Sequence, residues 1–137
     1  MVSKSNLVFS KSAASRILGV PKALIAGFKR FFRVCWVWVC GSRPRFISKK
    51  LFLQHFAEHR QQQGRELPVQ QWPNMPNWYE VGGQNNNYPV VIESTGPECA
   101  CEDYKNQIAT LGKGVCKHGY AVLLSLGYCT LRDYLAR

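Results

Sequence analysis

Cys99-Ala100-Cys101, followed after fourteen residues by Cys116-Lys117-His118, is the stretch of this chain that decides how its second half folds. Three thiols and one imidazole are typical ligands of zinc, which takes four such groups in a tetrahedral shell. Four protein ligands leave no position for water, so the pattern predicts one structural Zn²⁺ and no catalytic ion. The alternatives are disulfides or free thiols. Disulfides would leave His118 without a role and would require an exported chain.

The residues around this motif predict a pair of strands and a helix. β-prone runs at 78–81 and 88–94 flank a turn-forming cluster at 82–87, so we expect a hairpin. An apolar pattern that begins near His118 and stops at Gly127 indicates an amphipathic helix. Such a small assembly buries little apolar surface, and metal binding supplies about 10–16 kcal/mol of folding free energy in zinc-finger peptides.

The motif, placed after a hairpin and leading into a helix, resembles the SWIM zinc finger, whose pattern is C-x-C-x(n)-C-x-H in a ββα fold. The resemblance covers about residues 77–127. It implies binding to DNA or to another protein, and it implies no catalysis. The insert Glu102–Val115 is expected to be either a contact loop or a solvated connector, and surface loops more commonly behave as connectors.

The positive charge of the chain is confined to its first half. Residues 1–66 carry 13 Lys and Arg against 2 acidic residues, whereas residues 67–137 carry 5 against 6. The net charge of +10 therefore belongs to the first half. Such one-sided charge points to a polyanion partner, usually nucleic acid and sometimes a membrane surface. The longest apolar run, Val34–Cys40, is far shorter than the roughly 20 residues that cross a membrane, so no membrane partner is expected.

The first half shows the order helix, turn, helix, hairpin, helix. Ser10 or Ser12 can cap a first helix, Pro21 suits the opening of a second, and Ser48 can cap a third. Between the second and third helices, the apolar period changes from 3.6 to 2. The predicted elements are a helix over 13–18, a helix over 22–33, strands at 34–39 and 45–48, and a helix over 49–62.

This order, together with the segment Ala13–Pro21, resembles the winged helix-turn-helix of excisionase-like and MerR-like DNA-binding domains. The likeness covers about residues 10–60, although Pro21 replaces the usual Ser or Thr and the hairpin is unusually aromatic. The resemblance implies that the second helix enters the major groove of DNA and that the hairpin tip meets the backbone or the minor groove. The implied DNA contacts are Lys22, Lys29, Arg30 and Arg33 on the helix, and Arg43 and Arg45 at the wing tip.

The sequence therefore predicts an α+β chain of two modules. A basic winged helix-turn-helix-like module at 1–62 is joined by a Pro-punctuated linker at 63–76 to a ββα SWIM-like zinc module at 77–137. The expected function is a small zinc-binding, DNA-binding protein, regulatory or accessory to recombination. Two alternatives stay open. One is an adaptor whose zinc module docks a protein partner, and the other is an RNA-binding protein that stacks bases on Trp36 and Trp38.

No feature of the sequence indicates an enzyme. No nucleophile, acid–base carboxylate pair or phosphate-cradling Gly loop stands out, so neither catalysis nor a small-molecule substrate is expected. The expected location is the cytoplasm, on the nucleoid of a prokaryote, or the nucleus of a eukaryote. An organelle transit peptide stays an alternative, because no acidic residue precedes Glu58 and Ser is frequent early in the chain.

Overall fold

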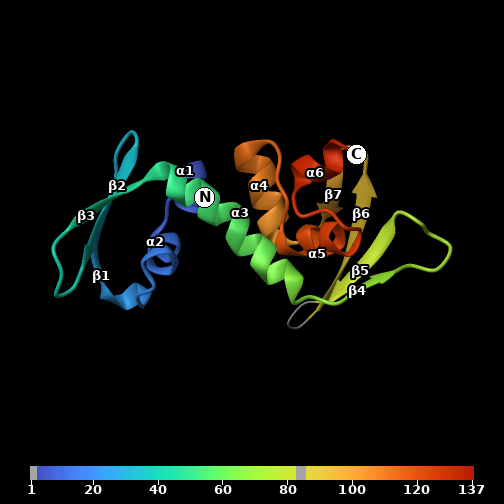
Figure 1. Ribbon diagram of the computed structural model, residues 1–137, viewed down its shortest axis with the longest axis horizontal. Helices are drawn as coiled ribbons and strands as arrows, with labels where there is room; N and C mark the ends of the chain where they lie inside the picture. The colour runs from blue at the N-terminus through green and yellow to red at the C-terminus, as the bar shows by residue number, and fades with distance from the viewer. Residues whose placement is uncertain (1–2, 83–85) are drawn as a thin grey trace. The chain divides into compact units, whose positions relative to one another are not determined.

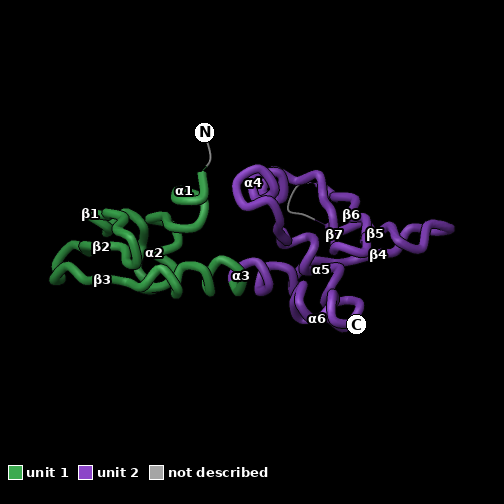
Figure 2. The backbone as a smooth tube through the Cα atoms, turned by 90° about the horizontal axis from the view of Figure 1, so that it is seen from above, with its two compact units in different colours: residues 1–58 green, residues 59–137 purple. Residues whose placement is uncertain are grey.

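The computed structural model describes residues 3–82 and 86–137, and the chain divides into two compact units. Residues 1–58 form unit 1 and residues 59–137 form unit 2 (Figure 1, Figure 2). Each unit has its own antiparallel sheet, its own helices and its own apolar core, so the chain is α+β as predicted. Among the described residues, no helix is both long enough and apolar enough to cross a membrane.

Unit 1 begins with two helices and continues into a three-stranded meander. Ser10 is the N-cap of the second helix and accepts a hydrogen bond from the backbone N–H of Ala13 at 3.1 Å, as predicted. Gly19 ends that helix in the left-handed conformation, with φ of 69°, which favours glycine. The elements of unit 1 are α1 (Lys4–Val8), α2 (Lys11–Leu18), the 3-10 helix η1 (Lys22–Leu24), β1 (Ile25–Arg30), β2 (Val34–Val39), β3 (Arg45–Ser48) and the first part of α3 (Lys49–Arg65).

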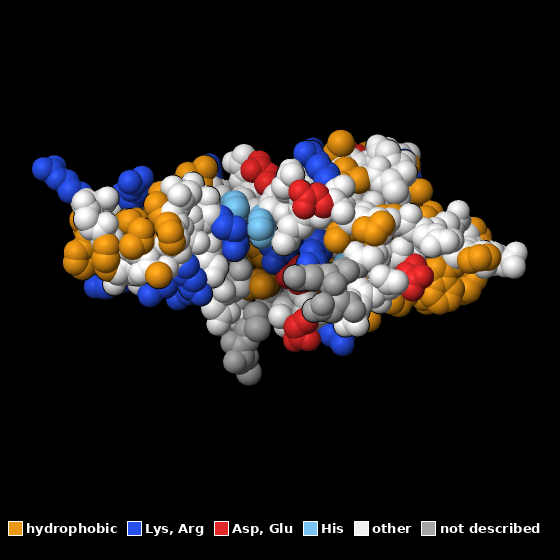
Figure 3. Space-filling model, turned by 90° about the horizontal axis from the view of Figure 1, so that it is seen from below, with side chains coloured by type: hydrophobic (Ala, Val, Ile, Leu, Met, Phe, Trp, Pro, Cys, Tyr) orange, Lys and Arg blue, Asp and Glu red, His pale blue; other side chains and the backbone are white. Residues whose placement is uncertain are grey.

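The sheet of unit 1 has the order β1-β2-β3, and its two faces differ. Alternate residues of β2, Cys35 and Val37 among them, are fully buried against the helices, whereas Trp38 is exposed on the opposite face. α1 and α2 lie on one side of the sheet (Figure 1). On the face of the molecule drawn in Figure 3, hydrophobic side chains of unit 1 lie among Lys and Arg side chains. The sheet therefore has one face in the core and one in solvent.

The predicted helix over 22–33 is wrong. Only its first turn is helical, as η1 directly after Pro21, and residues 25–30 form β1, which pairs antiparallel with β2. Glycine inside a helix costs about 1 kcal/mol relative to Ala, whereas in β1 the missing side chain of Gly27 leaves room for the Trp36 ring. Pairing with a neighbouring strand outweighs the local helical period. The winged helix-turn-helix is not confirmed, because the segment expected to enter the major groove is a strand.

The third predicted helix is confirmed and is longer than expected. Ser48 accepts a hydrogen bond from the backbone N–H of Lys50 at 3.2 Å, and α3 continues to Arg65. Phe52 on α3 is fully buried in the core of unit 1, where its ring meets that of Phe9 edge to face at 5.9 Å between centroids.

Unit 2 contains a four-stranded antiparallel sheet in the order β4-β5-β6-β7. The predicted hairpin is confirmed as β5 (Trp78–Gly82) and β6 (Asn87–Glu93), and residues 83–85 of its expected turn lie outside the described residues. β4 (Val69–Gln71) and β7 (Gly96–Cys99) extend this hairpin on either side, beyond the two strands that the sequence predicts. β4 and the end of α3 both fall within the residues 63–76 that were expected to be a linker.

The segment expected to be a loop, 102–115, instead contains the helix α4 (Glu102–Leu111). Two acidic residues in its first turn, Glu102 and Asp103, favour a helix start because they complement the helix dipole. Gly112 ends α4 in the left-handed conformation, with φ of 75°. Expectation and structure differ here because the acidic first turn and the terminal glycine stabilise a helix between the two ligand pairs.

Two further helices complete unit 2. The predicted amphipathic helix is confirmed as α5 (Lys117–Ser125), and α6 (Leu131–Leu135) follows with a capping box formed by Thr130 and Asp133. The Tyr134 hydroxyl on α6 donates a hydrogen bond to the carbonyl of Glu93 at 2.8 Å, which ties α6 to the end of β6. The core of unit 2 lies between the sheet and α5, and its most deeply buried members are Val81, Val90, Cys116, Val122 and Leu123.

Candidate metal centre

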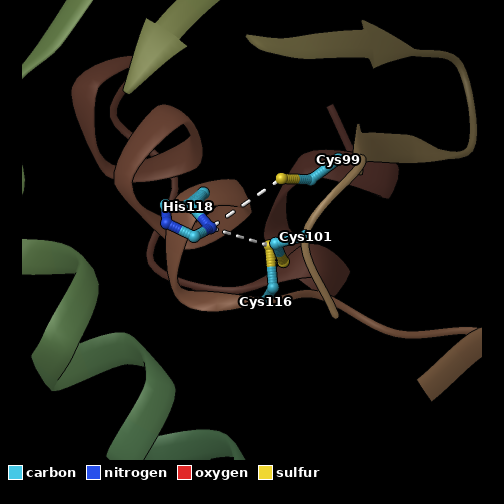
Figure 4. A group of neighbouring side chains, drawn as sticks. All are labelled: Cys99, Cys101, Cys116 and His118. Carbon is cyan, nitrogen blue, oxygen red and sulfur yellow. Dashed lines mark hydrogen bonds between the residues drawn. The ribbon is translucent and has the colours of Figure 1, made fainter. Parts of the chain in front are cut away.

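Two pairs of side chains, separated by fourteen residues of chain, meet where β7, α4 and α5 begin or end. Cys99 is the last residue of β7, and Cys101 is the N-cap of α4. Cys116 is the N-cap of α5, and His118 lies in the first turn of the same helix. All four point toward one another in Figure 4, and none is more than 9% exposed. The structure therefore brings together the four ligands that the sequence predicts.

Two of the cysteines replace the oxygen side chains that usually cap helices. Cys101 Sγ accepts a hydrogen bond from the backbone N–H of Tyr104 at 3.4 Å, and Cys116 Sγ accepts one from the backbone N–H of Gly119 at 3.4 Å. The start of a helix also carries a partial positive charge. Both sulfurs thus lie where backbone dipoles favour the thiolate, which is the form that binds metals.

The distances between the ligand atoms are compatible with one tetrahedral ion. His118 Nδ1 lies 3.8 Å from Cys99 Sγ and 3.8 Å from Cys116 Sγ, and all four ligand atoms lie within 4.8 Å of one another. Zinc bonds of about 2.3 Å to sulfur and about 2.0–2.1 Å to nitrogen would separate such atoms by roughly 3.5–3.8 Å. The four side chains could hold a metal ion, and they suit it because a buried set of three soft thiols and one imidazole has no other evident use.

The three thiols share hydrogen bonds that separate their pKa values. Hydrogen bonds with Cys116 and Cys99 lower the pKa of Cys101 far below its ordinary value. The hydrogen bond with Cys101 raises the pKa of Cys99 to about 11, and hydrogen bonds with Cys101 and Cys99, together with burial, raise the pKa of Cys116 strongly. In the metal-free protein, these shifts favour one thiolate in the cluster that accepts hydrogen bonds from two thiols. An ion that binds here displaces those two protons.

The imidazole of His118 is placed for metal binding through one nitrogen. Its Nδ1 faces the sulfurs, while Nε2 is buried and has no hydrogen-bond partner among the described residues. The Tyr88 ring covers the imidazole at 4.4 Å between centroids. Metal-ligating histidines usually donate the other N–H to an acceptor. In this site, packing against the Tyr88 ring orients the imidazole instead.

A hydrogen-bond network connects α4 to the residues just before Cys116. Gln107, which is 2% exposed, accepts from the backbone N–H of Val115 and donates to its carbonyl, both at 3.1 Å. The Gln107 amide also donates to Asp103 at 3.0 Å, and Asp103 accepts two hydrogen bonds of 2.8 Å from the guanidinium of Arg60. This chain of contacts fixes the position of Cys116 relative to Cys101, because Val115 and Asp103 are close neighbours of those two ligands.

Sequence reasoning missed Gln107, Asp103 and Arg60 as parts of the site. The only sequence signal for them is the four-residue spacing of Asp103 and Gln107, which places both on one face of a helix. That signal is visible only once the segment is known to be helical. Arg60 lies on α3, 43 residues from Asp103 in the chain, so no local pattern could connect them.

The six basic residues predicted to contact DNA lie on several elements of unit 1, and they do not share one helix. Arg30 differs from the rest because its Nε donates to the carbonyl of Phe9 at 2.7 Å and its guanidinium stacks on Phe28. All six are exposed, and the other five are Lys22 in η1, Lys29 in β1, Arg33 between β1 and β2, Arg43 between β2 and β3, and Arg45 at the start of β3.

The remaining cysteines lie outside the metal centre. Cys35 is buried in the core of unit 1, where burial raises the pKa of its thiol, and Cys40 and Cys129 are exposed.

Comparison with known proteins gives no match to this chain among protein-family models, curated proteins or solved structures.

Proposed function

We propose that this chain is a zinc-stabilised nucleic-acid-binding protein in which unit 1 contacts the nucleic acid. The observation that carries the proposal is the separation of charge between the two units. Unit 1 holds 11 Lys and Arg against 1 acidic residue, whereas unit 2 holds 7 against 7. A compact unit with nearly all of its charges of one sign creates a strong field that attracts a polyanion.

Zinc is the ion proposed for the four-ligand site, and its role is structural. Thiolate and imidazole ligands are those that zinc prefers, and a complete set of four leaves no open position for a substrate. The ion would hold the start of α4, the start of α5 and the end of β7 at one point. The order hairpin, C-x-C, C-x-H, helix supports a SWIM-type zinc module, now with a helix in its insert.

The expected helix over 22–33 is not available to enter the major groove of duplex DNA, because residues 22–30 form η1 and β1. All six basic residues first proposed as contacts nevertheless remain exposed on unit 1. They support phosphate contacts, which determine affinity and position more than sequence preference. A regulatory role, or one accessory to recombination, stays a prediction from the resemblance alone.

The test is a set of binding isotherms on a DNA duplex and on single strands of DNA and RNA, measured over a salt series. The slope of log affinity against log salt should be steep, at about 0.9 per phosphate neutralised on duplex DNA. The double variant Arg43→Gln/Arg45→Gln should reduce both the affinity and the slope. The matched control is Lys105→Gln/Lys113→Gln, which removes the same charge from exposed positions of unit 2 and should change little.

Two results would overturn the proposal. One is a shallow salt slope on every nucleic acid tested, and the other is an equal loss of affinity in both double variants. The first result would mean that unit 1 does not bind nucleic acid, and the second would mean that unit 2 contributes to binding as much as unit 1.

A further inference from the structure

The solvent-facing side of the sheet in unit 1 carries a row of aromatic side chains. Lys29 of β1 pairs with Trp36 of β2, and Trp36 pairs with Phe46 of β3, so these three side chains share one face. Trp38 lies on the same face, two residues further along β2. We call Lys29, Trp36, Trp38 and Phe46 the outer face. Their neighbours Cys35, Val37 and Ile47 point into the core on the opposite side.

The outer face exposes more aromatic surface than packing of the unit requires. Phe46 is 65% exposed and Trp38 is 43% exposed. Phe31, in the connection between β1 and β2, extends the aromatic surface because its ring lies 6.2 Å from that of Phe46. Aromatic side chains gathered on a surface in this way are unfavourable in water and commonly mark a binding site.

The two indole rings of the outer face are held in defined positions. A Cβ at Gly27 would lie 2.6 Å from the Trp36 ring, so that ring rests against the backbone of β1 where glycine gives it room. The Lys29 amino group lies 5.7 Å from the centre of the same ring. The Trp38 indole N–H donates to the carbonyl of Ser42 at 3.0 Å. Rings held in this way lose little conformational entropy when a flat ligand stacks on them.

Basic residues lie at both ends of the strand that carries the two tryptophans. Arg33 immediately precedes β2, and Arg43 lies in the connection that follows it, so positive charge lies near both ends of this strand. Arg45 pairs with Val37 and therefore lies on the opposite face of the sheet. The only acidic residue of unit 1 is Glu58, near the end of its part of α3. A ligand that suits this face offers flat apolar groups linked by negative charges.

We propose that the outer face binds single-stranded nucleic acid by stacking unpaired bases on Trp36, Trp38 and Phe46, with phosphates held by the flanking basic residues. The inference rests on the proposed function and names its ligand. Sheets with exposed aromatics stack two or three bases in RNA-binding domains, and aromatic stacking is available to any unpaired base, deoxyribose or ribose. A duplex hides its base faces, so the aromatic row would add nothing to duplex binding.

The experiment measures fluorescence anisotropy of three labelled probes with the 137-residue chain at one salt concentration. The probes are oligothymidylate, oligouridylate and a DNA hairpin duplex. Trp36→Leu and Trp38→Leu should each lower single-strand affinity by about 5- to 150-fold, the range measured for base–aromatic stacking, and leave duplex affinity unchanged. Trp38→Phe should restore most of the affinity, because it keeps an aromatic ring. The deoxyribose and ribose probes show which single strand is preferred, and preference for either supports the inference.

The matched control is Trp72→Leu in unit 2, which removes an indole that is 37% exposed and should change no affinity. Circular dichroism of each variant establishes that unit 1 remains folded, and Phe46→Leu serves as a third variant if a tryptophan variant does not fold. Three results would overturn the inference: equal losses on duplex and single strand, no loss in any outer-face variant, and an equal loss with Trp72→Leu. In those cases the chain still binds nucleic acid, and only the proposal that bases stack on the outer face is wrong. Absence of binding to all three probes would overturn the proposed function as well.

Discussion

The buried amide of Gln107 forms a two-way hydrogen bond with the backbone of Val115, accepting from its N–H and donating to its carbonyl, both at 3.1 Å. This is the pairing that one peptide group gives another in a sheet, but a side chain supplies it. Val115 directly precedes the metal-facing Cys116, and the Gln107 helix begins after Cys101. The relationship therefore determines how closely two of the four candidate ligands approach each other.

We expect Gln107→Leu to destabilise unit 2 by about 2–6 kcal/mol, because two buried backbone groups of Val115 lose their partner at about 1–3 kcal/mol each. Urea unfolding of the zinc-loaded protein, followed by release of metal to a coloured chelator, measures the change. Gln54→Leu is the matched control, because Gln54 is exposed and its amide donates within α3 to Glu58. Equal stability of the two variants would contradict a positioning role for Gln107.

Gly64→Ala should destabilise unit 2 by about 1–3 kcal/mol through overpacking. Gly64 lies in the part of α3 that belongs to unit 2, and a Cβ there would lie 2.8 Å from the Lys117 carbonyl oxygen and 2.9 Å from the Ala121 nitrogen. Both are backbone atoms of α5, so α3 and α5 would have to separate. Thermal unfolding measures the effect, and Gln62→Ala, at an exposed position of the same helix, should stay within about 0.5 kcal/mol of the parent.

Removal of the metal should unfold residues 77–127 and leave unit 1 folded and able to bind nucleic acid. Metal binding contributes about 10–16 kcal/mol in zinc-finger peptides, and a unit of this size has little else to replace it. Hydrogen exchange followed by mass spectrometry, with and without a chelator, reports each unit separately. Equal loss of protection in both units would contradict the independence of their cores.

His118→Ala should abolish zinc retention, whereas His118→Cys, which keeps four soft ligands, should retain the ion. Metal analysis after gel filtration distinguishes the two variants. Retention of zinc by both would mean that His118 is not a ligand.

Zinc binding should release about two protons near neutral pH and should strengthen as the pH rises. The pKa of Cys99 is raised to about 11 and that of Cys116 is raised strongly, so both thiols are protonated at neutral pH in the metal-free protein. The pKa of Cys101 is lowered, so its thiolate has no proton to release. Titration calorimetry in buffers of different ionisation enthalpy counts the protons. Release of three would mean that Cys101 is also protonated before the ion binds.

The sequence by itself determined the features that depend on neighbours within a few residues. The cap at Ser10, the cap at Ser48 and the hairpin of β5 and β6 follow from side chains that bond or pair locally. The four candidate ligands were also identified from sequence, because thiol and imidazole chemistry at this spacing has few other uses.

Only the tertiary structure decided where local signals competed. The local sequence pattern of residues 25–30 predicts a helix, but pairing with β2 makes them a strand. This pairing places Trp36 and Lys29 on a common face of the sheet. Arg60 reaches Asp103 across 43 residues of chain, a contact that no sequence period encodes. Strand pairing and buried hydrogen bonds gain their free energy from partners distant in sequence, so the outer face and the support of the metal centre became visible only in the folded chain.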